Sequence, residues 1–195
     1  SKLELAHFHY TQTYLIRALR LQLEMKANRR IYNGGTHESK PPVLGFTTEE
    51  METYSAQNPT IHVYQLLLPL DTDTPLSAFE NCIDQFFIHF DHIPDQDASL
   101  IGNHVINLIN SVYECTGEFQ LQQQMFKLYH FFWSQHKVFA DYFKHPRFFN
   151  NALSVAAHVK QSDWAYQVLE AMRPYFEARD KDTLDLGLAK IAQFS

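Results

Sequence analysis

The chain has 195 residues, of which 45% are hydrophobic and 14% aromatic, and its 16 lysines and arginines are outnumbered by 22 aspartates and glutamates. Its 6 glycines and 8 prolines are too few for a sandwich or a barrel, because such folds use these residues at every tight turn. The many apolar residues exclude a disordered chain, and the net charge of −6 disfavours a nucleic-acid binder.

The N-terminal third of the chain predicts three helices. Apolar residues recur at helical spacing over residues 3–32, and neither proline nor glycine interrupts them. A capping box of Thr47 and Glu50 begins a short helix, which ends at Asn58-Pro59. Residues 61–68 fit either a buried strand or a buried helix, and we expect a helix because no second strand is available to pair with it.

The middle of the chain predicts three longer helices. We expect Thr74 to be the N-cap of a helix that begins at Pro75 and extends to about residue 90. Pro94-Asp95 begins the next helix, which ends at Thr116-Gly117. The third covers residues 118–136.

The C-terminal part predicts three more helices. The first covers residues 148–159 and the second begins at Asp163, with Pro174 near its end as a kink or a stop. The last covers residues 182–194, with Asp180 or Asp182 as its cap. The chain is therefore expected to be all-α, with about nine helices and no strand.

Two of the predicted junctions are alike. Thr116-Gly117-Glu118-Phe119 and Gln161-Ser162-Asp163-Trp164 each place a small residue, an acid and an aromatic between two amphipathic helices, 45 residues apart. The acid complements the positive end of the helix dipole, and the aromatic can pack on the preceding helix. Such helical pairs bury both faces only by stacking on neighbours, so the pattern predicts stacked antiparallel hairpins in an α-solenoid.

Several short segments carry a resemblance to a known family: Asn150-Asn151-Ala152-Leu153, Asp163-Trp164-Ala165, Arg173-Pro174-Tyr175-Phe176, Leu188-Ala189-Lys190-Ile191, and more weakly Asn58-Pro59 with Tyr64 and Gly117-Glu118 with Leu128-Tyr129. They resemble a family of uncharacterised bacterial helical-repeat proteins, which are similar to tetratricopeptide-repeat (TPR-like) proteins and longer than this chain. The resemblance implies a TPR-like fold and no catalytic residue. Lys160 departs from the tetratricopeptide pattern, because it occupies the place where glycine usually ends the first helix.

We expect one helical-repeat domain over residues 1–195, with a long N-terminal helix and loop over 1–45, irregular hairpins over 46–145 and the best-matching repeat over 146–195. The chain lacks an initiator methionine, and its last predicted helix has no partner helix. Both features lead us to expect a fragment of a longer protein.

The cysteines and the hydropathy bear on the compartment. Cys82 and Cys115 each lie among apolar neighbours, so we expect two buried free thiols. No run of 18 apolar residues and no signal-peptide pattern is present, and we therefore expect a cytoplasmic protein without membrane contact.

Histidines suggest one alternative function, that of a metal-dependent enzyme. His89 and His92 lie three residues apart on one predicted helix face, with Asp91, Asp95 and Asp97 close by, and such clusters can hold metal ions. Histidines near a helix C-terminus are also favoured by the dipole alone, which is the preferred explanation. No other catalytic pattern appears, and we expect neither a cofactor nor an enzyme.

A basic first helix suggests a second alternative, a nucleic-acid-associated regulator. Its basic residues are Arg17, Arg20, Lys26, Arg29 and Arg30. Arg17 and Arg20 share a face that could contact phosphates, but the acidic net charge favours a solvated helix face instead.

Aromatic residues suggest the preferred function. The candidate partner-binding residues are Phe132, Trp133, Phe148 and Phe149, because so dense a run cannot all face one core. Burial between adjacent hairpins is the competing explanation. We expect a non-catalytic interaction scaffold whose grooves bind apolar residues of another protein, or of another segment of the same longer chain.

Overall fold

The computed structural model describes residues 2–33 and 45–194, without the side chains of residue 5 and of residues 27–33. Within these ranges every regular element is a helix, which confirms the all-α class. The chain forms two compact units, Ser1–Val105 and Ile106–Ser195, and each is described by itself. The division falls inside one helix, and the expected single helical-repeat domain over residues 1–195 stays a prediction.

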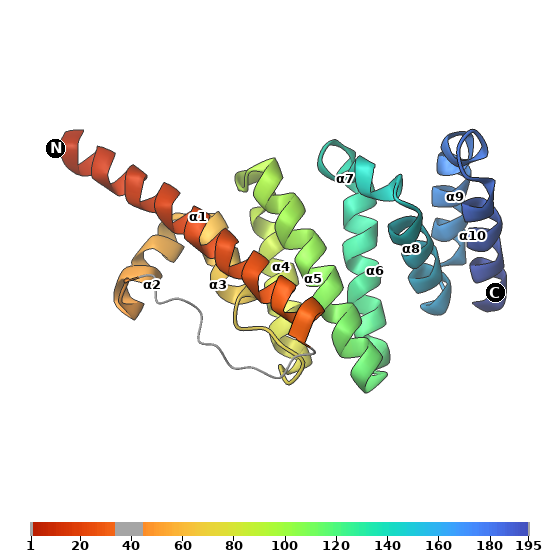
Figure 1. Ribbon diagram of the computed structural model, residues 1–195, viewed down its shortest axis with the longest axis horizontal. Coiled ribbons are helices and arrows are strands. Elements are labelled where there is room, and N and C mark those ends of the chain that lie inside the picture. The colour runs from red at the N-terminus through yellow and green to blue at the C-terminus, as the bar shows by residue number, and fades with distance from the viewer. Residues whose placement is uncertain (1, 34–44, 195) are drawn as a thin grey trace. The chain divides into compact units, whose positions relative to one another are not determined.

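The first unit contains four helices, a 3-10 turn and the start of a fifth helix (Figure 1). Their bounds are α1 Lys2–Asn33, α2 Thr48–Gln57, α3 Pro59–Leu67, α4 Leu76–His89, η1 Phe90–His92 and α5 Asp95–Thr116. α3 packs against α1, α2 and α4, and its buried residues include Ile61 and Tyr64. On α1 no described side chain before Leu15 is buried, and the N-terminal end of this helix extends beyond α3 in Figure 1.

The predicted break at Asn58-Pro59 joins two helices directly. Thr47 and Glu50 form the predicted capping box at the start of α2. Asn58 ends α2 and caps α3, because its side-chain oxygen accepts hydrogen bonds from the backbone N–H groups of Thr60 (3.0 Å) and Ile61 (3.3 Å). The helix expected over residues 61–68 is confirmed, and it begins earlier because Pro59 suits a first helical position.

The predicted role of Thr74 is wrong. The N-cap of α4 is Pro75, which makes no side-chain capping bond. Thr74 closes the preceding turn instead, since its hydroxyl donates to Asp71 Oδ1 (2.9 Å) and accepts from the Asp71 backbone N–H (2.8 Å). A threonine before proline looks the same in the sequence whether it caps a helix or closes the turn that precedes the helix.

The second unit contains the rest of α5 and five further helices, namely α6 Phe119–Ser134, α7 His136–Phe143, α8 Pro146–His158, α9 Ser162–Glu177 and α10 Lys181–Phe194. The described residues contain ten α-helices, one more than the approximate count of nine that we expected. The missed helix is α7. It is separated from α6 only by Gln135, and neither proline nor glycine marks that break.

Both junctions that suggested a repeat follow a helix end with left-handed backbone. Gly117 ends α5 with φ 70° and donates its N–H to Tyr113 O (2.8 Å). Lys160 follows α8 with φ 64°, where Lys160 N–H donates to Ala157 O (3.0 Å) and Gln161 N–H to Ala156 O (2.8 Å), the Schellman pattern. Lys160 therefore adopts the conformation for which glycine is preferred.

The C-terminal helices pack closely. α8, α9 and α10 contact one another, and a Cβ atom added to Gly187 of α10 would lie 2.8 Å from Leu153 Cδ1 of α8. Asp180 is the cap of α10, because its carboxylate accepts from the backbone N–H (3.3 Å) and the hydroxyl (2.7 Å) of Thr183. Pro174 does not stop α9, which continues to Glu177.

Cys82 is a buried free thiol, as expected, and burial raises its pKa to about 12. Cys115 is exposed near the end of α5, so the prediction that it is buried is wrong. Apolar neighbours in sequence do not bury a residue that lies on the outer face of a helix. Among the described residues, no helix has the combination of length and hydropathy that a bilayer-spanning helix needs.

Candidate functional site

Two of the four predicted partner-binding residues lie in the core of the second unit. Phe132 is buried and stacks on Phe139 of α7, with ring centroids 3.9 Å apart. Phe149 is buried and its ring centroid lies 4.8 Å from that of Phe176 on α9. Neither side chain is accessible to a partner in this structure, which corresponds to the competing explanation of burial between helices.

The other two partner-binding candidates are half-buried. Trp133 and Phe148 both pack edge-on against the ring of Phe143, with ring centroids 5.0 Å and 5.2 Å from it, respectively. α7, which the sequence analysis missed, supplies Phe143 and so covers much of the aromatic run. Partner binding in this region stays a prediction, and it is restricted to the accessible parts of Trp133 and Phe148.

The histidine pair does not gather further ligands. His89 ends α4 and lies edge-on to His62 of α3, with ring centroids 5.6 Å apart, while His92 lies in η1 and is exposed. His62 Nδ1 is within hydrogen-bond distance of Ser55 Oγ, at 3.0 Å. Within the described residues, no group of three or more histidines, cysteines, aspartates or glutamates is placed to hold a metal ion.

The basic residues of the first helix point in different directions. Arg17 is exposed, but Arg20 binds Asp97 of α5, and Lys26 Nζ donates to the carbonyls of Leu68 (2.5 Å) and Leu70 (2.6 Å) beyond the end of α3. Arg29 and Arg30 lie outside the described side chains. Of the predicted strip residues with described side chains, Arg20 and Lys26 have partners within the chain, and these two do not form an open basic strip with Arg17.

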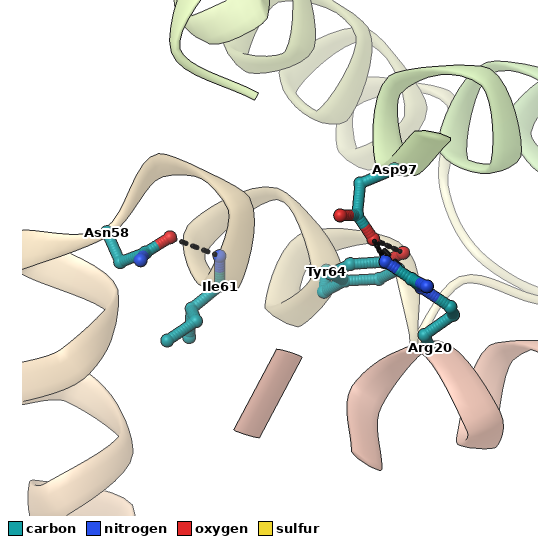
Figure 2. Close-up of polar contacts among 5 residues, drawn as sticks. All are labelled: Arg20, Asn58, Ile61, Tyr64 and Asp97. Carbon is teal, nitrogen blue, oxygen red and sulfur yellow. Dashed lines mark hydrogen bonds and ion pairs between the residues drawn. The ribbon is translucent and has the colours of Figure 1, made fainter. Parts of the chain in front are cut away.

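Arg20, Tyr64 and Asp97 form a polar cluster inside the first unit, where α1, α3 and α5 meet (Figure 2). Asp97 Oδ1 accepts three hydrogen bonds, from Arg20 Nε (3.1 Å), Arg20 Nη2 (2.8 Å) and Tyr64 Oη (2.7 Å). Asp97 and Tyr64 are buried, whereas the Arg20 side chain remains 24% exposed. The carboxylate also lies in the first turn of α5, where the helix dipole favours a negative charge.

The electrostatics of this cluster hold Tyr64 neutral and Arg20 charged. Burial raises the pKa of Tyr64 far above its ordinary value, and the hydrogen bond to Asp97 and its charge act in the same direction. For Arg20, partial burial lowers the pKa, but the hydrogen bonds and charge of Asp97 outweigh that effect and raise it. A buried phenol with a raised pKa is a poor acid or base near neutral pH. The hydrogen bonds of the cluster link three helices.

Sequence patterns did not indicate this cluster. Along the sequence Arg20 belongs to a basic helix face and Asp97 to the surroundings of a histidine pair, and the two residues are 77 positions apart. Nothing in local spacing relates them. The only available signal was a carboxylate in the first turn of a helix whose neighbours are apolar.

A second group of aromatic residues is only partly buried: Tyr14 is exposed, and Phe8, Phe46 and Tyr54 are half-buried. Phe8 of α1 stacks on Tyr54 of α2, with ring centroids 5.4 Å apart. The ring of Phe46 lies edge-on to that of Tyr54, with centroids 6.1 Å apart. The ring centroid of Tyr14 on α1 lies 6.4 Å from that of Phe46. None of these rings is buried, and α2 contains no buried residue at all. We call these four residues the α1–α2 aromatic cluster.

α2 carries three exposed glutamates, Glu49, Glu50 and Glu52. Only Glu50, four residues before Tyr54, lies on the same side of the helix as that ring. A basic side chain of a partner could contact this carboxylate while apolar ones meet the rings. Sequence patterns did not indicate the α1–α2 aromatic cluster because its residues come from three separate segments, whereas the candidates of the second unit are two pairs of adjacent residues.

Comparisons with protein families, with curated proteins and with solved structures found no match for this chain. The resemblance to TPR-like proteins stays a prediction.

Proposed function

We propose that the protein is a non-catalytic helical scaffold that binds another protein, or another segment of a longer chain. The observation that carries this proposal is the α1–α2 aromatic cluster, in which each of four rings contacts at least one other and none is fully buried. Scattered exposed apolar residues are ordinary on a surface, but a contiguous group is characteristic of an interaction site.

The packing of α2 supports this interpretation. A surface helix normally buries one apolar face on the core, whereas α2 buries no residue and has Tyr54 half-exposed beside Phe8. Covering these rings with apolar side chains of a partner would supply the burial that the chain itself does not. Aromatic residues also dominate the binding energy of protein interfaces, because they bury a large area with few rotatable bonds.

The charges indicate the chemistry of the partner. With the exposed Glu50 on the same side of α2 as Tyr54, the matching surface is an amphipathic helix that carries lysine or arginine next to its apolar face. Because the carboxylates are exposed, we expect them to speed association at low salt and to lose this effect as salt screens them.

The fold contributes to the proposal through its C-terminal part. α8, α9 and α10 pack on one another, and the helices before both repeat junctions end with left-handed backbone. A TPR-like stacking of hairpins is the arrangement we propose for the scaffold, and it would leave α1 and α2 as the element that presents the binding face.

The test uses a photo-crosslinker. A benzophenone amino acid at Tyr54 should crosslink a partner in cells, and the purified partner should bind the chain directly. Tyr54→Ala should then weaken that binding by about 10-fold or more, as for aromatic interface residues generally. Tyr166→Ala is the matched control, because Tyr166 is an exposed tyrosine of the second unit. Equal crosslinking from both positions, or unchanged affinity of Tyr54→Ala, would refute the proposal.

A further inference from the structure

One face of α1 carries four of the most exposed large apolar side chains of the described residues. Leu3 is 81% exposed, Tyr10 77%, Tyr14 53% and Leu21 56%. At 3.6 residues per turn their directions fall within about 40° of one another around the helix axis. The buried residues Leu15 and Leu19 lie on a different side of the same helix.

This face has the spacing of a coiled-coil seam. His7 and Arg17, both exposed, lie between the four apolar residues, so that the positions 3, 7, 10, 14, 17 and 21 alternate in steps of four and three. Such alternation keeps one narrow stripe facing a partner helix over several turns. We call these six residues the α1 stripe.

The α1 stripe is complementary to itself in the antiparallel direction. When a second copy of the helix is reversed about the level of residue 12, Leu3 lies opposite Leu21 and Tyr10 opposite Tyr14. The remaining pair brings Arg17 opposite His7. A two-fold axis requires this kind of pattern, because the same patch must match itself on both subunits.

A parallel pairing in register is less favourable. It would place Arg17 of one copy against Arg17 of the other, and like charges at such a distance repel. The distribution of charge and of apolar residues therefore selects the antiparallel arrangement.

We propose that the α1 stripe is covered by a second copy of this chain, in an antiparallel two-fold dimer. The available area is adequate but small. Aromatic side chains bury roughly 150–250 Å² each and leucines somewhat less, so the exposed parts of these four side chains on both copies remove on the order of 1,000 Å² from water. Specific interfaces begin near this size, and the dimer is expected to form reversibly at micromolar concentrations.

The association test is sedimentation velocity of the full chain between about 1 and 200 μM. The unmodified chain and the control Ile88→Glu should dimerise as concentration rises, since Ile88 is an exposed apolar residue of α4 outside the stripe. Tyr10→Glu and Leu21→Glu should be monomeric with unchanged helical circular dichroism. A chain that stays monomeric at the highest concentration overturns the proposal, and so do dimers that persist in both stripe variants.

Disulfide crosslinking tests the direction in a Cys115→Ser background, in which the remaining Cys82 is buried. A mixture of Leu3→Cys and Leu21→Cys proteins should form mixed disulfides. Leu3→Cys alone should not crosslink, because antiparallel helices place the two residues 3 about 27 Å apart at 1.5 Å rise per residue. Crosslinking of Leu3→Cys alone, or no mixed disulfide, overturns the antiparallel arrangement.

This inference goes beyond the proposed function and does not depend on it. The α1 stripe shares only Tyr14 with the α1–α2 aromatic cluster, and neither Tyr10 nor Leu21 belongs to that cluster. Loss of the dimer in Leu21→Glu and loss of partner binding in Tyr54→Ala are therefore separate outcomes.

Discussion

Replacement of Asp97 by alanine is the sharpest test of how the first unit is held together. The change removes the acceptor of three hydrogen bonds and leaves the Tyr64 hydroxyl buried without its partner. A hydrogen bond to a charged group contributes about 1.5–3 kcal/mol, and breaking a buried ion pair costs about 3–5 kcal/mol. Because Arg20 is 24% exposed and regains water, we expect a loss near the lower end, about 3 kcal/mol.

The assay is urea unfolding followed by two signals. Circular dichroism reports all helices, whereas tryptophan fluorescence reports the second unit, because both tryptophans, Trp133 and Trp164, lie there. Asp97→Ala should lower the urea midpoint seen by circular dichroism. At slopes of about 1–3 kcal/mol/M, a loss of this size moves the midpoint by 1 M or more.

The control and a second variant make the reasoning refutable. Asp84→Ala removes an exposed carboxylate from α4 of the same unit and should change the midpoint little. Tyr64→Phe keeps the ring but removes the hydroxyl donor, and it should cost about 1.5–3 kcal/mol. If Asp97→Ala unfolds at the same urea concentration as Asp84→Ala, the cluster does not stabilise the unit and our account of it is wrong.

Three further predictions concern the helix ends and the close packing. Lys160→Gly should be more stable than Lys160→Ala by about 1 kcal/mol in thermal unfolding, because both lose the lysine side chain but only glycine relieves the φ of 64°. Gly187→Ala should destabilise by about 1 kcal/mol in urea unfolding despite its better helix propensity, and Leu153→Val should offset part of the loss, because the added Cβ lies 2.8 Å from Leu153 Cδ1. A carboxyl NMR titration should find the pKa of Glu50 below 4.5, because its carboxylate accepts hydrogen bonds from the Thr47 backbone N–H and hydroxyl. The capping box therefore stabilises the folded state fully above the pKa that Glu50 has in the unfolded chain. This stabilisation is lost as the pH falls through the lowered pKa of the folded state.

Each of these predictions can be contradicted by one result. Equal melting temperatures for the two Lys160 variants would mean that the left-handed backbone carries no strain. Additive effects of Gly187→Ala and Leu153→Val would mean that the two positions are not in contact. A Glu50 pKa at or above 4.5 would mean that the capping box does not form in solution.

Local signals were sufficient wherever a helix end is made by neighbouring residues. The capping box of Thr47 and Glu50, the cap at Asp180 and the left-handed Gly117 all depend on groups a few positions apart. Local signals failed at Thr74, whose hydroxyl accepts from the backbone N–H of Asp71 instead of capping α4. They also failed at Gln135, where the helix breaks without proline or glycine. Helical periodicity does not register a break of one residue, so α7 was missed.

Whether a candidate site residue is accessible depends on long-range contacts. Phe132, Trp133, Phe148 and Phe149 were candidates because aromatic residues are dense in these parts of the sequence, yet α7 packs on Phe132 and α9 on Phe149, and both rings are buried. The α1–α2 aromatic cluster is diffuse in sequence and became visible only when its three segments were placed together. Density along the chain therefore does not indicate exposure.

Low glycine, helical periodicity and short capping motifs were enough to establish an all-α protein, because a helix satisfies its backbone hydrogen bonds within its own segment. Tertiary structure alone decided which side chains of each helix are covered, since burial depends on neighbours tens of residues away. It turned Arg20 inward to Asp97 and left Tyr10 and Leu21 of the same helix open. Spacing in the sequence describes the faces of a helix, and packing decides which of those faces meets water.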